Sequence, residues 1–94
     1  TARDQSEHDI QQYTVQPGSP VEQMNYGELF RTLYETRSVV PIGVSKADGE
    51  ERTLLKLPAD DVPLNAGDIL VLIASGADIT PLQNEWNLSL GGTG

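Results

Sequence analysis

The sequence has no cysteine, and this absence excludes disulfide bonds and thiolate–zinc sites. Aromatic residues make up only 5% of the chain, so we expect Leu, Val and Ile to fill its core. A long apolar segment is also missing, because the longest run, residues 69–74, is far shorter than the roughly 20 residues of a membrane-spanning helix. We find no secretory signal peptide. These absences favour a soluble domain in a reducing, cytoplasmic compartment.

Positive charge is scarce as well. The chain has six Lys and Arg residues against 14 Asp and Glu residues, and its net charge is −8. The basic residues are scattered, whereas a phosphate backbone or an anionic membrane surface needs a basic face. The charge therefore argues against nucleic acid as a partner and against a lipid-binding segment.

A length of 94 residues corresponds to one domain, whose small core a second copy of the chain would help to bury. We predict that residues 11–88 form the domain. Residues 1–10 are predicted to be a polar tail or linker, and residues 89–94 a flexible C-terminal end. The chain begins with Thr1 and its only Met is internal, so we expect it to belong to a longer parent protein.

The strongest helical signal begins at Asn25. Asn25 is a good N-cap, and Glu28 follows three residues later, which is the pattern of a capping box. Apolar residues then recur at helical spacing, and Arg37 beyond them would complement the helix dipole. The apolar residues form one stripe along the helix, which consists of Tyr26, Leu29, Phe30, Leu33 and Tyr34.

This helical stripe has two interpretations. In the first, the whole stripe packs on a sheet of its own domain. In the second, part of the stripe packs on a second copy and forms a dimer interface, since tyrosine is favoured at interfaces and the core is small. The sequence leaves the two interpretations nearly even.

A β-hairpin is predicted after the helix. β-Branched residues are dense over residues 38–46, and Asp48-Gly49 is a turn signal before a second strand at residues 52–57. Pro41 lacks an amide donor, so the first of these strands should lie at an edge of the sheet or be bulged at Pro41.

A central strand is predicted at residues 69–74, where an apolar run between two glycines indicates burial on both faces. A first strand is predicted over residues 11–16, and a second helix begins near Asp78 or Thr80 with Leu82 and Trp86 on one face. The prediction is thus an α+β domain with a small mixed or antiparallel sheet and two helices, in the order β-α-β-β-β-α.

Catalytic motifs are hard to find. The sole histidine, His8, lies in the polar N-terminal stretch, where we expect it to be solvated. No serine has the Gly-x-Ser-x-Gly pattern, and no glycine-rich loop leads into a helix to bind phosphate. We therefore do not expect an enzyme.

A candidate cation site is formed by Asp60, Asp61 and Asp68, because Ca²⁺ binds several oxygen ligands from flexible loops. The alternating Asp-x-Asp-x-Asp pattern of calcium loops is absent, and solvated loop acids are the favoured interpretation. Asp68 also has a structural role open to it, since it follows Gly67 and can accept hydrogen bonds from turn amides where the strand begins.

Three pieces of the sequence occur in a recognisable order. They are Tyr26-Gly27-Glu28-Leu29-Phe30, Val39-Val40-Pro41-Ile42-Gly43-Val44, and a stretch running from Leu57-Pro58-Ala59-Asp60-Asp61 to Leu64-Asn65-Ala66-Gly67-Asp68-Ile69-Leu70-Val71-Leu72. Their order and spacing resemble the C-terminal lobe of RCK domains, also called the TrkA-C domain. The resemblance covers residues 13–86. The family often has an Arg near the end of the first hairpin strand, where this chain has Ser45-Lys46.

The resemblance implies a function in potassium transport. RCK domains form gating rings of ligand-gated potassium channels and cytosolic subunits of potassium uptake systems, so the parent would be membrane-embedded or bound to a membrane protein. Such lobes pair as homodimers or larger rings and respond to calcium or other divalent cations, nucleotides or cyclic dinucleotides. The chain would be a cytosolic regulatory lobe that controls gating.

Two alternatives stay open. The chain could be a free-standing ligand-sensing or adaptor module that binds another protein, in which case the polar N-terminal residues are a native tail. It could also be an enzyme fragment, for which the acids at residues 60, 61 and 68 would have to form a concave site.

Overall fold

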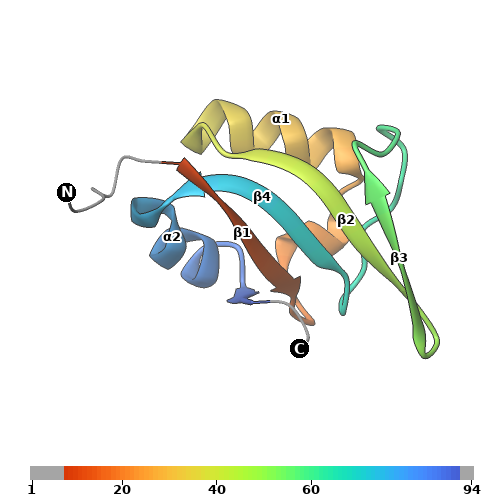
Figure 1. The fold of residues 1–94 in the computed structure, drawn as a ribbon. Helices are drawn as coiled ribbons and strands as arrows, with labels where there is room; N and C mark the ends of the chain where they lie inside the picture. The colour runs from red at the N-terminus through yellow and green to blue at the C-terminus, as the bar shows by residue number, and fades with distance from the viewer. Residues whose placement is uncertain (1–7, 92–94) are drawn as a thin grey trace.

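Residues 8–91, which the computed structural model describes, form an antiparallel sheet with helices on one of its faces (Figure 1). The fold class is α+β, as predicted, and a short 3₁₀ turn precedes each helix. The elements are β1 (His8–Val15), η1 (Pro20–Gln23), α1 (Tyr26–Arg37), β2 (Val40–Asp48), β3 (Glu51–Lys56), β4 (Ile69–Ser75), η2 (Gly76–Asp78), α2 (Ile79–Asn84) and β5 (Leu88–Leu90).

The sheet has the strand order β3-β2-β4-β1-β5, and every neighbouring pair is antiparallel. Of the two sheet types predicted, the antiparallel one is therefore confirmed. β4 lies at the centre, as its apolar run predicted. Within the described residues no helix is long and apolar enough to cross a membrane.

The predicted order of elements is wrong at the C-terminal end, where a fifth strand follows α2. Asn87 has a left-handed backbone (φ 50°), which turns the chain back after α2, and Leu88 and Leu90 then pair with Val15 and Tyr13 of β1. Part of the predicted flexible end is thus strand. At the other terminus β1 begins at His8, inside the predicted tail, and residues 1–7 lie outside the described part.

Helix α1 is confirmed with the predicted cap. The Asn25 side chain accepts a hydrogen bond from the Glu28 amide (2.9 Å), which satisfies one of the free donors of the first turn. The helix ends at Ser38, whose left-handed φ of 57° lets its amide reach the Leu33 and Tyr34 carbonyls.

The bulge predicted at Pro41 is present. β2 is an inner strand, but its register with β4 shifts between Pro41 and Gly43. Since β3 pairs with β2 only as far as Gly43, Pro41 has no strand on its other side that would need its missing amide donor.

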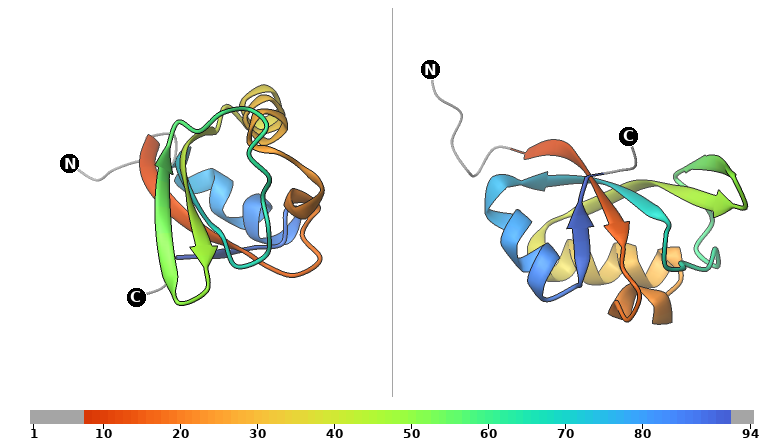
Figure 2. Two further views of the ribbon diagram at one scale, coloured as in Figure 1. Left: turned by 90° about the vertical axis from the view of Figure 1, so that its right-hand side faces the viewer. Right: turned by 90° about the horizontal axis from the view of Figure 1, so that it is seen from below.

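The central strand β4 is fully buried on one face, whereas its other face is buried only at its two ends, at Ile69 (5% exposed) and Ser75 (8% exposed), which corrects the prediction of burial on both faces. Leu70, Leu72 and Ala74 are fully buried, whereas the alternate residues Val71 and Ile73 are partly exposed. Figure 2 shows the reason, because both views place α1, α2 and η1 on the same side of the sheet. The core lies on that side.

Asp68 ties three strands together. Its buried carboxylate accepts hydrogen bonds from Lys46 Nζ (2.5 Å) and the Ala47 amide (3.1 Å) in β2, and from the Asn65 amide (2.9 Å) in the loop before β4. Its backbone carbonyl accepts a hydrogen bond from the Val15 amide at the end of β1 (2.8 Å). The structural role predicted for Asp68 is therefore confirmed.

Asp68→Asn should lower the free energy of unfolding by about 3 kcal/mol, because the substitution leaves Lys46 without the charge that balances it in a largely buried pair. Urea unfolding measures the change. Asp61→Asn, the same substitution at an exposed loop position, is the matched control and should stay within about 0.5 kcal/mol of the original chain. Equal losses for the two variants would contradict the role assigned to Asp68.

Candidate functional site

The three predicted cation ligands do not form a site. Asp68 is buried and its oxygens are occupied by Lys46 and two backbone amides, while Asp60 and Asp61 are exposed. Across residues 8–91, no three His, Asp or Glu side chains are grouped so that they could hold a metal ion. The structure therefore gives no support to the predicted cation site.

The helical stripe packs mainly on its own sheet. Leu29 and Leu33 have no exposed surface and Tyr26 has 4%, so these three side chains belong to the core. Phe30 is partly buried, and Tyr34 is 56% exposed. Only Phe30 and Tyr34 have much surface that a second copy could contact. The other three residues of the stripe pack on the sheet of their own domain.

The aromatic residues of α1 contact one another along the helix, edge to face at Tyr26 and Phe30 and stacked at Phe30 and Tyr34. The ring centroids of Tyr26 and Phe30 are 6.1 Å apart, and those of Phe30 and Tyr34 are 6.2 Å apart. A small depression of about 230 Å³ adjoins them, with the strongly exposed Leu57 on its rim. Its volume is below the roughly 300 Å³ of the smallest usual ligand pockets, so it is a weak candidate.

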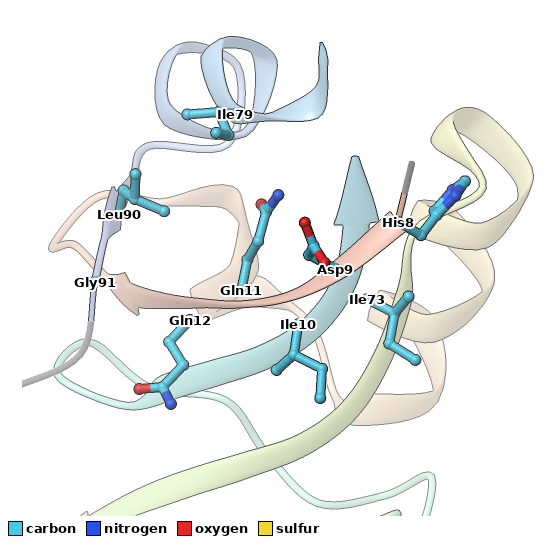
Figure 3. A pocket seen from close by; sticks show the side chains of 9 residues that line it. All are labelled: His8, Asp9, Ile10, Gln11, Gln12, Ile73, Ile79, Leu90 and Gly91. Atoms are coloured by element: carbon cyan, nitrogen blue, oxygen red, sulfur yellow. The ribbon is translucent and has the colours of Figure 1, made fainter. Parts of the chain in front are cut away.

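A larger depression, of about 840 Å³, lies beside the N-terminal half of β1 (Figure 3). It exists because β5 pairs with β1 only over residues 13–15, so that the described part of β5 does not continue alongside the first half of β1. The depression is broadly open to solvent, and its volume is in the range of small-molecule sites. Its lining residues are His8, Asp9, Ile10, Gln11, Gln12, Ile73, Ile79, Leu90 and Gly91.

The depression reaches around both sides of β1. Figure 3 shows Ile10, Gln12 and Ile73 on one side of the strand and Gln11 on the other, toward Ile79 of α2. Its apolar groups thus come from β1 near one end of the described chain and from β4, α2 and β5 near the other. Neither Lys nor Arg is among its lining residues, so it would hold the uncharged part of a ligand and leave any phosphate group in solvent.

The polar groups behind this depression are used by the fold. The Gln11 side-chain amide donates to the carbonyls of Ala74 (3.3 Å) and Ser75 (3.1 Å), and its oxygen accepts from the Tyr13 hydroxyl (2.5 Å). The Asp78 carboxylate accepts from the Ser75 amide (3.0 Å) and hydroxyl (2.9 Å). These groups are positioned for structure, and the arrangement resembles no acid–base or nucleophilic constellation.

The second face of the sheet is the feature that the sequence analysis missed. The strand registers place three central rows of residues on this side, with Ala47–Arg52 beyond them at one end and His8–Ser75 at the other, and we call the three central rows the open face. No helix of the described chain covers it (Figure 2). No residue that the registers place on this side of the sheet is acidic, and its charged residues are Lys56 and, opposite Ala47 near the hairpin turn, Arg52. The rows are Val40–Ile73–Ile10, Lys56–Gly43–Val71–Gln12 and Leu54–Ser45–Ile69–Thr14–Ser89.

The sequence held only a partial signal for the open face. Ile10, Gln12 and Thr14 alternate with Gln11, Tyr13 and Val15, but the apolar run of β4 does not reveal which of its residues face a helix. That depends on both helices packing on the same side.

A comparison with known protein families and with curated proteins finds no match to this chain. The resemblance to the TrkA-C domain therefore stays a prediction from the residues quoted above.

The stability of the chain should fall in alkaline solution. Burial raises the pKa of the Tyr13 hydroxyl from 10.0 to about 12, and the nearby Asp78 carboxylate adds to the rise. Above pH 10 the unfolded chain therefore loses this proton while the folded chain keeps it. The stabilisation is fully present below about pH 10 and is lost as the pH rises toward about 12. Urea unfolding across this range measures the loss.

Tyr13→Phe should make the alkaline loss smaller, because the substitution removes the titrating group. Some of the loss should remain, since burial and Asp60 also raise the pKa of Tyr26. An unchanged pH dependence in Tyr13→Phe would show that Tyr13 is not its source.

Proposed function

We propose that this chain is the cytosolic regulatory lobe of a potassium channel or potassium transporter, and that it acts by pairing and by binding a small ligand. In this proposal the chain corresponds to the C-terminal lobe of an RCK domain, and its α+β fold with an antiparallel sheet is the scaffold of that lobe. Its role is to bind a ligand and thereby change the arrangement of the paired lobes. The membrane protein attached to it responds to that change and carries out the transport.

One observation carries this proposal: the three recognised pieces of sequence pack against one another through the residues that define them. Tyr26 donates its hydroxyl proton to the Pro41 carbonyl (2.5 Å) and its amide proton to the Val62 carbonyl (2.9 Å). The Gly27 amide donates to the Asp60 carbonyl (2.9 Å). The helix, the strand and the loop are thus joined at their recognised positions.

Gly27 shows why the residue type matters. A Cβ atom at this position would lie 2.8 Å from the Asp60 Cβ and 2.9 Å from its Cγ, closer than real contacts allow. A glycine here lets the loop lie directly on the first turn of α1. The three quoted pieces thus have linked structural roles in this chain, which supports treating them as one pattern.

The depression beside β1 is the proposed ligand site. Its apolar walls come from β1, β4, α2 and β5, so a ligand there contacts elements from both ends of the described chain. A ligand shifts the arrangement of paired lobes only by its difference in affinity between the two arrangements. A site at the margin of the open face can have such a difference in affinity, because pairing of two copies changes which groups surround the ligand.

The proposal predicts that a ligand stabilises the chain. We would measure the melting temperature and the solution mass with calcium chloride, ATP and cyclic di-AMP in turn. A ligand at one hundred times its Kd adds about 2.7 kcal/mol, which should raise the melting temperature of a domain of this size by about 10 °C or more.

Leu90→Trp is the variant for the site, because Leu90 lines the depression without belonging to the open face. It should reduce the ligand-induced rise in melting temperature, whereas Leu57→Trp, at an exposed leucine outside the depression, should retain it. A chain that stays monomeric and responds to none of the three compounds would refute the regulatory lobe and favour an adaptor module.

A further inference from the structure

We infer that two copies of this chain pair face to face through the open face of the sheet. This inference rests on the proposed function in one respect, that the lobe works as a pair. The surface itself follows from the geometry, and it differs from the α1 stripe on which the sequence placed the dimer interface.

The open face has an apolar side chain in each of its three rows. Ile10 is 66% exposed and Leu54 is 53% exposed, at its two margins. Between them lie the partly exposed Val71 and Ile73 of β4. A Cβ at Gly43 would lie 3.6 Å from Leu54 Cδ1 and 3.9 Å from Val71 Cβ, so these two side chains flank a position that has none.

The distribution of charge favours a second copy as the occupant. A chain with a net charge of −8 repels its own copies at surfaces that carry acids. The three rows of the open face contain no Asp or Glu, and strand alternation places Asp9, Asp48 and Glu51 on the opposite side. Two copies can therefore meet on this face without bringing carboxylates together, while the acids stay in solvent.

The size of the face is sufficient for a weak dimer. Five strands about 4.8 Å apart, with a length of about 23 Å for a seven-residue strand such as β4, give a face of roughly 550 Å². Two such faces bury roughly 1,100 Å², just above the roughly 1,000 Å² expected of a biological interface. A pair of this size is weak enough for a ligand to change its geometry.

The position of Lys56 selects the arrangement of the pair. If the two-fold axis ran across the strands through the row of Lys56, β3 would lie over β3 and would bring the two Lys56 side chains together. An axis along β4 instead places β3 of one copy over β5 of the other, and sheets packed in this way keep their strands roughly aligned. Since Lys56 and Gln12 share one row, Lys56 of the second copy then lies near Gln12, at the margin of the depression.

Analytical ultracentrifugation of the chain and four lysine variants tests the pairing surface. Ile10→Lys and Leu54→Lys place a charge on the open face and should raise the dimer Kd at least about tenfold. Tyr34→Lys and Leu57→Lys are the controls, because these residues are exposed to a similar degree (56% and 68%) but lie off this face. Their Kd should change less than about threefold. Melting temperatures establish that each variant is folded.

The outcomes separate this inference from the proposed function. A dimer that Tyr34→Lys or Leu57→Lys dissociates, and that the open-face variants leave intact, overturns the inference but keeps a pairing lobe. A chain that is monomeric at millimolar concentration overturns both. The arrangement has its own test, since Gln12→Glu should tighten the dimer by attracting Lys56 of the second copy. A looser dimer in Gln12→Glu overturns the arrangement along β4.

Discussion

The buried carboxylate of Asp68 holds the sheet together at the point where its strands converge. It binds Lys46 and Ala47 of β2 and the turn at Asn65, while its backbone accepts a hydrogen bond from Val15 of β1. A buried charge is tolerated only when it is paired and hydrogen-bonded, and Asp68 meets both conditions. This arrangement fixes where β4 starts between β1 and β2, and hence which side of β4 faces the helices.

One-sided packing of the helices follows from that placement and sets the properties of the surface. Tyr13, Leu70 and Leu72 are fully buried beneath α1 and α2, whereas Val71, Ile73 and Ile10 lie on the other side with solvent access. A sheet with one uncovered apolar face has surface left to bury. The core, the open face and the depression at the margin of β1 are therefore consequences of the same arrangement, which joins the stability of the lobe to its proposed pairing.

The local elements were largely predictable, because their signals are local. Asn25 and the apolar spacing after it predicted α1, and Asp48-Gly49 predicted the hairpin, since caps and turns depend on a few neighbouring residues. The fifth strand was missed because Leu88–Leu90 are too short for a periodic signal and pair with residues over 70 positions away. The acids were grouped on sequence proximity alone, although Asp68 is committed to Lys46, 22 residues earlier.

The sequence by itself determined the elements, the aliphatic core, the acidic net charge and the pattern that resembles the TrkA-C domain. Only the tertiary structure decided which set of alternate residues in each strand is covered by helices. Strand alternation defines two faces of the sheet but does not determine on which face the helices pack. It also decided that Leu29 and Leu33 face the core while Ile10 and Leu54 face solvent. Packing between distant segments made these choices, since the free energy of burying one face depends on every element that contacts it.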